Sequence, residues 1–335
     1  MTTTPDPFLD PVLDPVLDPV ARRDIDTAAA RIAGDVRVTP LLTLGGAALG
    51  LDPSLTLLLK LEQLQVGGSF KARGMFNRLR AQAERGALPA AGAIVASGGN
   101  AGIAVAAAAR ALGVACEVFV PELASAAKRA ALVALGARVT VGGATYADAL
   151  QAARQRQHET GALWMHAYDQ PEVVAGAGTL AREFEQQAGG LPDRLLVSVG
   201  GGGLVAGIAA WCASRCWIDA LEPVGAPTLH AARAAGAPVD VAVSGLAADA
   251  LGARRLGDIA WAVSQQHVQA VHLLADAAIA EAQALLWREL RLLVEPAAAL
   301  PLAALRQGVV RPAPGERVGL VICGANLALK DLELP

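Results

Sequence analysis

Short apolar segments alternate with alanine-rich segments along most of this chain. The apolar segments include LTLLLKL at residues 55–61, AIVAS at 93–97 and VGLVIC at 318–323. Short apolar runs between turn signals are typical of buried strands, and the alanine-rich stretches after them predict helices. Strands that alternate with helices form parallel sheets with crossover connections. The pattern therefore predicts an α/β fold.

The same pattern gives the expected bounds of most elements. Strands are expected at residues 55–61, 93–97, 116–121, 138–142, 195–199, 271–275 and 318–323. Helices are expected at residues 26–33, after Ser69, from Gly102, through Lys128 and Arg129, and at 204–213.

Length and the N-terminal repeat bear on domain organisation. A single hydrophobic core rarely grows beyond about 250 to 300 residues, so a chain of 335 residues predicts two lobes. Residues 6–20 read DPFLDPVLDPVLDPV, with a proline at every fourth position. Proline at this density excludes helix and removes donors from a sheet. We therefore expect residues 1–20 to form a disordered arm.

Composition argues against two classes of partner. A formal charge of −3 and an aromatic content of 4% offer neither a basic surface nor stacking platforms for nucleic acid. Residues 86–109 and 195–214 are uncharged and long enough to span a bilayer, but clustered glycines interrupt both. We therefore expect neither nucleic-acid nor membrane binding. No secretory signal is recognised at the N-terminus, which favours a cytoplasmic location.

Four consecutive glycines, Gly200 to Gly203, follow the predicted strand 195–199 and precede an apolar helix. Free backbone N–H groups at a helix N-terminus favour an anion, and the absence of side chains allows a phosphate to approach closely. A flexible turn is the alternative interpretation.

The tetraglycine also fits the GxGxxA pattern of dinucleotide-binding folds, through Gly201, Gly203 and Ala206. Asp219 or Glu222 follows near the distance expected for a ribose acceptor. A nicotinamide-dependent oxidoreductase is therefore a second hypothesis, although the fingerprint normally follows the first strand of its domain.

Lys71 is the candidate nucleophile. If Ser69 is the N-cap, Lys71 lies in the first turn of a helix, where the helix dipole disfavours a cation. A lysine whose neutral form is favoured suits Schiff-base chemistry, since the free amine is the nucleophile. A surface lysine that extends into solvent is the alternative interpretation.

Four motifs then occur in a recognisable order: GGSFKARG at residues 67–74, SGGNAG at 97–102, the tetraglycine, and CGAN at 323–326. Together they resemble the serine/threonine dehydratase branch of the fold-type II (tryptophan synthase β-like) pyridoxal phosphate enzymes. The resemblance extends from about Asp24 to Asn326.

The resemblance implies an architecture of two three-layer α/β domains, with mainly parallel sheets and the active site in the cleft between them. Residues 21–80 and 165–335 would form the large cofactor-binding domain, and residues 81–164 the small mobile domain. It also implies a homodimer or homotetramer.

The resemblance implies a role for each site residue. Lys71 would hold pyridoxal 5'-phosphate and remove the Cα proton of the substrate, and Asn100 would donate to the cofactor's ring oxygen. Cys323 would face the pyridine nitrogen. The implied cofactor-binding residues are Phe70, Lys71, Asn100, Gly200, Gly201, Gly202, Gly203 and Cys323. The implied substrate-binding residues are Ser97, Gly98, Gly99, Asn100 and Ala101.

The implied reaction is α,β-elimination of water from L-threonine or L-serine, which gives 2-oxobutyrate or pyruvate and ammonia. A neutral thiol at Cys323 makes the ring a less complete electron sink and favours elimination over transamination. Racemase relatives carry a serine at the position of Gly98, so racemisation is disfavoured. The alternatives are an ammonia-lyase for 3-hydroxyaspartate or phenylserine, and a cofactor-binding relative without turnover.

Relatives often bind a divalent cation near the segment that begins at Glu222. In this chain Glu222 is the single candidate ligand for a divalent or monovalent cation, because Thr228 stands where relatives carry a second acidic residue. The chain also departs from the family pattern at Gly67, Ala101 and Ala297. His158 and His166 are assigned to structure or solvent, since their spacing pairs them with no nucleophile.

Overall fold

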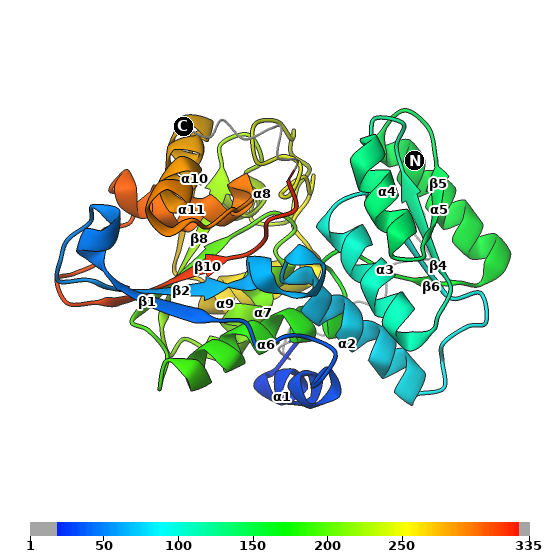
Figure 1. Ribbon diagram of the computed structural model, residues 1–335, viewed down its shortest axis with the longest axis horizontal. Helices are drawn as coiled ribbons and strands as arrows, with labels where there is room; N and C mark the ends of the chain where they lie inside the picture. The colour runs from blue at the N-terminus through cyan, green and yellow to red at the C-terminus, as the bar shows by residue number, and fades with distance from the viewer. Residues whose placement is uncertain (1–18, 328–335) are drawn as a thin grey trace.

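The computed structural model describes residues 19–327, which form two sheets flanked by helices (Figure 1). The predicted α/β class is confirmed. Most of the arm expected at residues 1–20 lies outside the described residues. Val20 is described, and it is buried in the core of the larger sheet.

The larger sheet has six strands in the order β1-β2-β10-β7-β8-β9. β1 pairs with β2 in the antiparallel sense, and the remaining pairs are parallel. The strands are β1 (Leu41–Gly45), β2 (Thr56–Leu61), β7 (Arg194–Ser198), β8 (Trp217–Pro223), β9 (Ala270–Leu274) and β10 (Arg317–Ile322). Because β10 lies between β2 and β7, it joins the pair β1 and β2 to the strands β7, β8 and β9 in one sheet.

Helices cover both faces of the larger sheet. α10 and α11 pack against each other on one face, and α6, α7, α9 and α1 lie on the other (Figure 1). The bounds of these helices, with α8, are α1 (Arg22–Arg31), α6 (Pro171–Gln187), α7 (Gly203–Cys212), α8 (Thr228–Ala235), α9 (Asp258–His267), α10 (Asp276–Leu290) and α11 (Pro296–Arg306). α7 is apolar on all sides, and all its residues are buried. Such a helix needs neighbours all round, which α6, α9 and the sheet provide.

The smaller sheet has four parallel strands in the order β5-β4-β3-β6. α3 and α4 pack on one face and α5 on the other (Figure 1). These elements are β3 (Ala93–Ala96), α3 (Asn100–Leu112), β4 (Cys116–Val120), α4 (Ala126–Ala134), β5 (Arg138–Val141), α5 (Tyr146–Thr160) and β6 (Leu163–Trp164).

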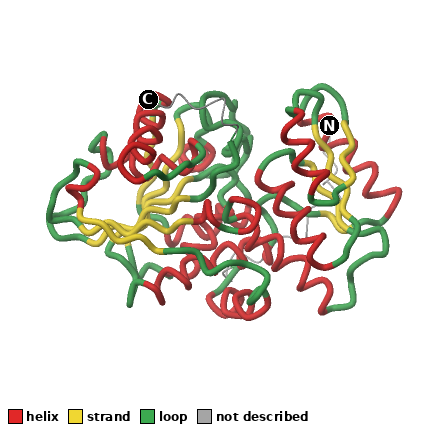
Figure 2. The backbone as a smooth tube through the Cα atoms, viewed as in Figure 1, coloured by secondary structure: helices red, strands yellow, loops and turns green. Residues whose placement is uncertain are grey.

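α2 (Lys71–Glu84) connects the two sheets. It packs against α6 of the larger unit and against α3 of the smaller one, and Figure 2 shows the two groups of strands on either side of it. Three short 3-10 helices complete the described elements: η1 (Gly46–Leu49), η2 (Glu62–Leu64) and η3 (Val66–Gly68). The start of α2 therefore lies close to both sheets.

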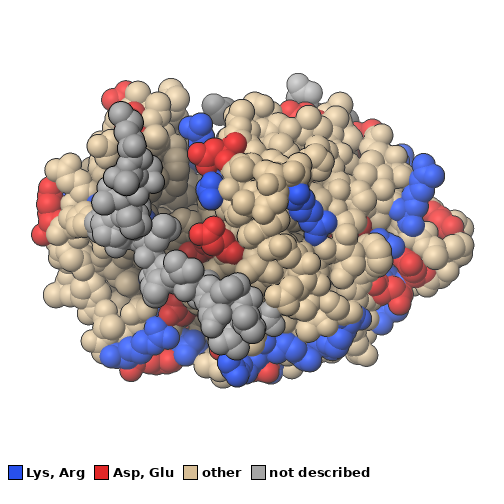
Figure 3. Space-filling model, turned by 180° about the vertical axis from the view of Figure 1, so that it is seen from behind, with Lys and Arg blue, Asp and Glu red and all other residues tan. Residues whose placement is uncertain are grey.

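Charged side chains are unevenly distributed on the surface. On the face seen in Figure 3 many of them gather along the lower edge and at one end, and wide areas between are uncharged. Within residues 19–327 no helix is both long and apolar enough to cross a membrane.

Candidate active site

Lys71 is the first residue of α2, as predicted. Ser69 is not the N-cap, and that prediction was wrong: Phe70 occupies the N-cap position, and no side chain caps the helix. The reason is that Ser69 forms an isolated antiparallel bridge with Gly324, which holds its backbone extended (φ −161°, ψ 162°). Phe70 N also donates to Cys323 O (3.0 Å). The start of α2 is therefore fixed to the segment that follows β10.

The amino group of Lys71 lies in an enclosed environment. Its Nζ donates to the backbone carbonyl of Ala167 at 2.7 Å. Burial lowers the pKa of Lys71 to about 8, and Cys323 and Glu295 oppose this shift when they are ionised. A substantial fraction of Lys71 is therefore a neutral amine near pH 8, which is the form that attacks a carbonyl group.

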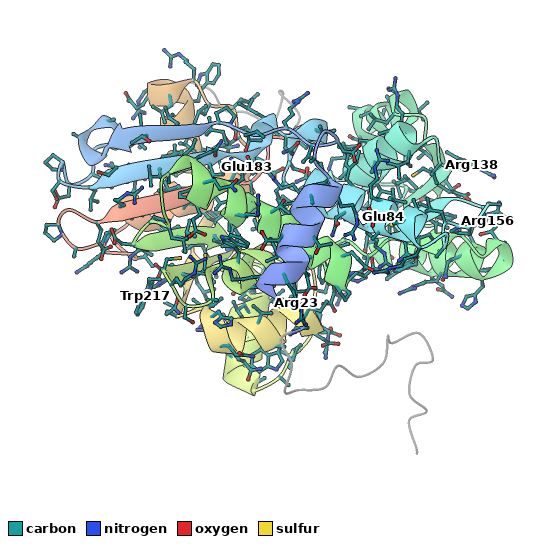
Figure 4. All side chains as sticks on the ribbon, turned by 90° about the horizontal axis from the view of Figure 1, so that it is seen from below. Arg23, Glu84, Arg138, Arg156, Glu183 and Trp217 are labelled. Atoms are coloured by element: carbon teal, nitrogen blue, oxygen red, sulfur yellow. The ribbon has the colours of Figure 1, made fainter. Side chains whose placement is uncertain are left out.

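A buried ion-pair network anchors α2. Nε and Nη2 of Arg73 donate to the two carboxylate oxygens of Glu62 (2.8 and 2.7 Å), and Nη1 and Nη2 donate to those of Glu183 on α6 (both 3.0 Å). Lys60 Nζ completes the network with a 2.5 Å contact to Glu183. In Figure 4, which views the molecule from below, Glu183 lies on α6 in front of the strands of the larger sheet. Because two cations balance two carboxylates, the network holds Lys71 in place without a net buried charge.

The tetraglycine, Gly200 to Gly203, connects β7 to α7 as predicted. Gly202 is the N-cap of α7, has a φ of 88°, and leaves the helix without a side-chain cap. A Cβ atom at residue 201 would lie 2.3 Å from the ring of Tyr168. The carbonyl of Gly200 accepts a hydrogen bond from Thr228 Oγ1 (2.5 Å). The loop is thus a fixed cradle at a helix N-terminus, which suits an anion.

Tyr168 belongs to a short segment that the sequence analysis did not assign to the site. Nδ1 of His166 accepts hydrogen bonds from the backbone N–H groups of Tyr168 (3.3 Å) and Asp169 (2.9 Å). Burial lowers the pKa of His166 to about 4, so the ring is neutral at pH 7. His166 therefore holds the turn that contains Ala167, whose carbonyl binds Lys71.

The segment from Ser97 to Ala101 follows β3 and runs into α3, which begins at Asn100 and not at Gly102. Gly99 is the N-cap, and no side chain caps this helix. Ser97 Oγ accepts a hydrogen bond from Gly99 N (3.3 Å). The first turn of α3 therefore keeps N–H groups that no side-chain cap occupies, which suits recognition of a carboxylate.

Asn100 lies in a polar cluster with Glu295 and Asn326. Its Nδ2 donates to both carboxylate oxygens of Glu295 (2.9 and 3.0 Å), and its Oδ1 accepts from Asn326 Nδ2 (2.7 Å). Cys323 Sγ lies 4.0 Å from Glu295 Oε1. Burial raises the pKa of Cys323 well above its ordinary value, so the thiol is neutral at pH 7. The structure thus brings Asn100 and Cys323 together around one carboxyl group.

Glu295 is a second residue of the site, besides Tyr168, that was not predicted from the sequence. Its side chain is 3% exposed, and burial raises its pKa to about 7. The available signal was a lone glutamate followed by a proline in the apolar segment VEPAAA. A carboxylate in such a segment costs free energy unless it has a specific partner.

Glu222 accepts three hydrogen bonds, from Thr228 Oγ1 (3.0 Å), Leu229 N (2.7 Å) and His230 N (2.9 Å). Its carboxyl group therefore binds the N-terminal end of α8, and burial raises its pKa to about 7. Within residues 19–327, no group of three or more His, Cys, Asp or Glu side chains is arranged to hold a metal ion.

The segments described above meet at one edge of the fold. The loops that follow β3, β7 and β10 all lie at the carboxyl ends of parallel strands, which is where α/β folds bind ligands. Phe70, Lys71, Tyr168 and Gly203 line one small pocket there.

Comparison with known proteins identifies related chains. Residues 32–324 match the model of the family described as "Pyridoxal-phosphate dependent enzyme". The chain is 38% identical to an L-threonine ammonia-lyase of Geobacter sulfurreducens over 280 residues, which cover 82% of this chain and 68% of that protein. It is 35% identical to a phenylserine dehydratase of Ralstonia pickettii, over 80% of this chain and 82% of that protein. The solved structure of maize serine racemase superposes with a TM-score of 0.85 at 29% identity, covering 93% of this chain and 95% of that one.

Proposed function

Because the chain belongs to the family of pyridoxal-phosphate dependent enzymes, in its serine/threonine dehydratase branch, we propose that it eliminates the β-hydroxyl group of L-threonine or L-serine. The products are 2-oxobutyrate or pyruvate, and ammonia. The observation that carries the proposal is Lys71, a lysine with a pKa of about 8 at the start of α2, beside the neutral thiol of Cys323.

The residues present fit pyridoxal phosphate. Lys71 offers the amine, and Gly200 to Gly203 lead into the N-terminus of α7, whose backbone N–H groups have no side-chain cap. Ser69 Oγ is buried and has no hydrogen-bond partner in the described part of the chain. A buried hydroxyl without a partner is costly, and a phosphate or ring oxygen would provide one. Bound pyridoxal phosphate supplies the electron sink that makes the Cα proton of an amino acid acidic.

This chain's own residues then have distinct tasks. Lys71 would hold the cofactor through its amine and would accept the Cα proton of the substrate. The N-terminus of α7 would bind the phosphate through backbone N–H groups, and Phe70 would pack beside the ring. The segment from Ser97 to Ala101 would bind the substrate carboxylate at the N-terminus of α3, and Asn100 would donate to the ring oxygen.

Two positions favour elimination over other reactions of the family. The neutral thiol of Cys323 would not enforce a charged pyridine ring, which would favour loss of the β-substituent over transamination. Gly98 has no side chain and therefore cannot return a proton to the second face of Cα. Racemisation, the activity named for the maize relative, needs such a group.

Two further substrates are alternatives. The relative from Ralstonia pickettii is named a phenylserine dehydratase, and one from Paracoccus denitrificans, 31% identical, a beta-hydroxyaspartate dehydratase. A cofactor-binding protein without turnover is a third possibility. The family match replaces the dinucleotide interpretation, and Asp219 is engaged by Arg194 and His272. Assembly as a homodimer or homotetramer and a cytoplasmic location stay predictions.

One experiment tests the proposal. The purified full-length chain is loaded with pyridoxal phosphate, reduced with borohydride and digested, and the labelled peptide is identified by mass spectrometry. Production of 2-oxo acid is then measured with threonine, serine, 3-hydroxyaspartate and phenylserine. Labelling of Lys71 and turnover of threonine or serine support the proposal. Labelling without turnover of any of the four substrates would favour a binding protein, and labelling of another lysine would overturn the assignment of Lys71.

A further inference from the structure

Glu295 is the N-cap of α11, yet its carboxyl group does not cap that helix. Acidic N-cap side chains usually accept a hydrogen bond from the first turn of their own helix. Here both oxygens face Asn100 on α3 instead, at 2.9 and 3.0 Å. The side chain is 3% exposed. The carboxyl group is thus directed into the candidate active site and forms no capping hydrogen bond with the first turn of α11.

The polar groups around Glu295 come from four parts of the fold, and three of these groups are titratable. Lys71 approaches from α2, Cys323 from the end of β10, and Asp249 from the segment between α8 and α9, while Asn100 of α3 is neutral. Within residues 19–327, no lysine or arginine forms an ion pair with Glu295. Lys71 is therefore the cation whose charge lowers the pKa of Glu295, and it does so without a direct ion pair.

Glu295 is also the anion that acts on Lys71. Both Cys323 and Glu295 are close enough to raise the pKa of Lys71 when ionised. Burial keeps the Cys323 thiol neutral at pH 7, because its pKa is raised well above its ordinary value. The pKa of Glu295 is about 7, so a large fraction of Glu295 is ionised in the neutral range.

The hydrogen bonds between Glu295 and Asn100 fix the orientation of the Asn100 side-chain amide. Asn100 Nδ2 points to Glu295, and Asn100 Oδ1 accepts a hydrogen bond from Asn326 Nδ2 (2.7 Å). Asn326 Nδ2 also donates to Gly67 O (2.7 Å), next to the Lys71 segment. The Glu295 carboxylate can only accept hydrogen bonds, and Asn326 Nδ2 can only donate them. A flip of the Asn100 amide, which exchanges its Oδ1 and Nδ2, would therefore break both contacts.

We propose that Glu295 is a positioning residue of the candidate active site, which orients the Asn100 amide and provides the negative charge facing Lys71. The inference rests on the proposed function only in treating Lys71 and Asn100 as site residues. Glu295 acts through these two residues and need not touch the substrate. Its charge sets how readily Lys71 loses a proton, and its hydrogen bonds set where the amide N–H group points.

The test measures Lys71 directly in the cofactor-free, full-length protein. The sequence contains four lysines, so acylation with trace acetic anhydride at a series of pH values can be read for each lysine by peptide mass spectrometry. The variants are Glu295→Gln, which removes the charge, and Glu295→Asp, which keeps the charge but moves it. Asp219→Asn is the matched control, because Asp219 is a buried carboxylate bound by Arg194 and His272 on β7 and β9.

Glu295→Gln is expected to lower the pH midpoint of Lys71 acylation by about one unit, the size expected for a nearby opposite charge. Glu295→Asp restores part of this shift, and Asp219→Asn leaves the midpoint unchanged. An unchanged midpoint in both Glu295 variants, or an equal shift in Asp219→Asn, overturns the inference. If Glu295→Gln does not fold, as judged by circular dichroism, the Glu295→Asp midpoint alone decides, and a value equal to wild type overturns it.

The outcome is separable from that of the proposed function. A lowered Lys71 midpoint in a protein that produces no 2-oxo acid supports the role of Glu295 and rejects the proposed reaction. Turnover of threonine, together with an unchanged Lys71 midpoint in the variants, supports the proposed reaction and rejects the role of Glu295.

Discussion

The ring of Tyr168 packs against Gly201 so closely that a Cβ atom at residue 201 would lie 2.3 Å from ring atom Cδ1. Gly201→Ala must therefore displace the ring or the glycine loop. We expect a loss of about 1–3 kcal/mol in the free energy of unfolding, measured by urea denaturation, and weaker binding of pyridoxal phosphate. Gly45→Ala is the control, because Gly45 has a negative φ and open space around it. If Tyr168→Ala does not relieve the defect of Gly201→Ala, the ring is not its cause.

Lys71→Ala removes the amine from the pocket. The rate of 2-oxo acid formation is expected to fall by about a thousandfold or more, because the variant lacks both the covalent link and the base. Borohydride should no longer fix the cofactor to the protein, and added methylamine should restore part of the rate. A variant that keeps more than a tenth of the wild-type rate would exclude Lys71 as the base.

Arg73→Met leaves Glu62 and Glu183 without their shared cation. Removing one partner of a buried ion pair costs about 3–5 kcal/mol, and we expect a loss of this size in the free energy of unfolding, measured in urea. The control is Arg80→Met on the same helix, whose ion pair with Asp35 is partly exposed and contributes about 0–1 kcal/mol. Similar losses in the two variants would show that burial of the network is not what stabilises α2.

Burial raises the pKa of Glu222 from 4.5 to about 7. The folded state therefore binds more protons than the unfolded state between these values, and this group makes the protein less stable as the pH rises from 4.5 to 7. Glu222→Gln does not titrate. We expect its free energy of unfolding, relative to wild type, to increase by about 3 kcal/mol between pH 4.5 and pH 7.5, measured by urea denaturation. A constant difference would mean that Glu222 has the same pKa in both states.

The pattern of apolar residues predicted the strands that form nearly unbroken apolar runs in the sequence. The strands expected at 55–61, 93–97 and 318–323 match β2, β3 and β10 within a residue or so. β1, β6 and β8 were not predicted, and β6 has only two residues. β1 is an edge strand with partly exposed residues. β8 contains Asp219 and Glu222, and two acidic residues argue against a buried strand unless their partners on other elements are known.

The site was predicted where a motif is local and missed where it depends on tertiary contacts. The glycine loop and Lys71 were recognised from neighbouring residues. Ser69 was assigned as a cap because nothing in the sequence shows its bridge to Gly324. Glu295 and Tyr168 were not assigned, because their partners, Asn100 and Gly201, are far away in the sequence.

The central position of β10 also determines when the site can form during synthesis. β2 and β7 are each paired with β10 and not with each other. The hairpin of β1 and β2 and the strands β7 to β9 must therefore wait for residues 317–322 to leave the ribosome before they join in one sheet. Contacts this distant in sequence are slow to form. The larger sheet, with the site at the carboxyl ends of its strands, is therefore complete only after residues 317–322 have been synthesised.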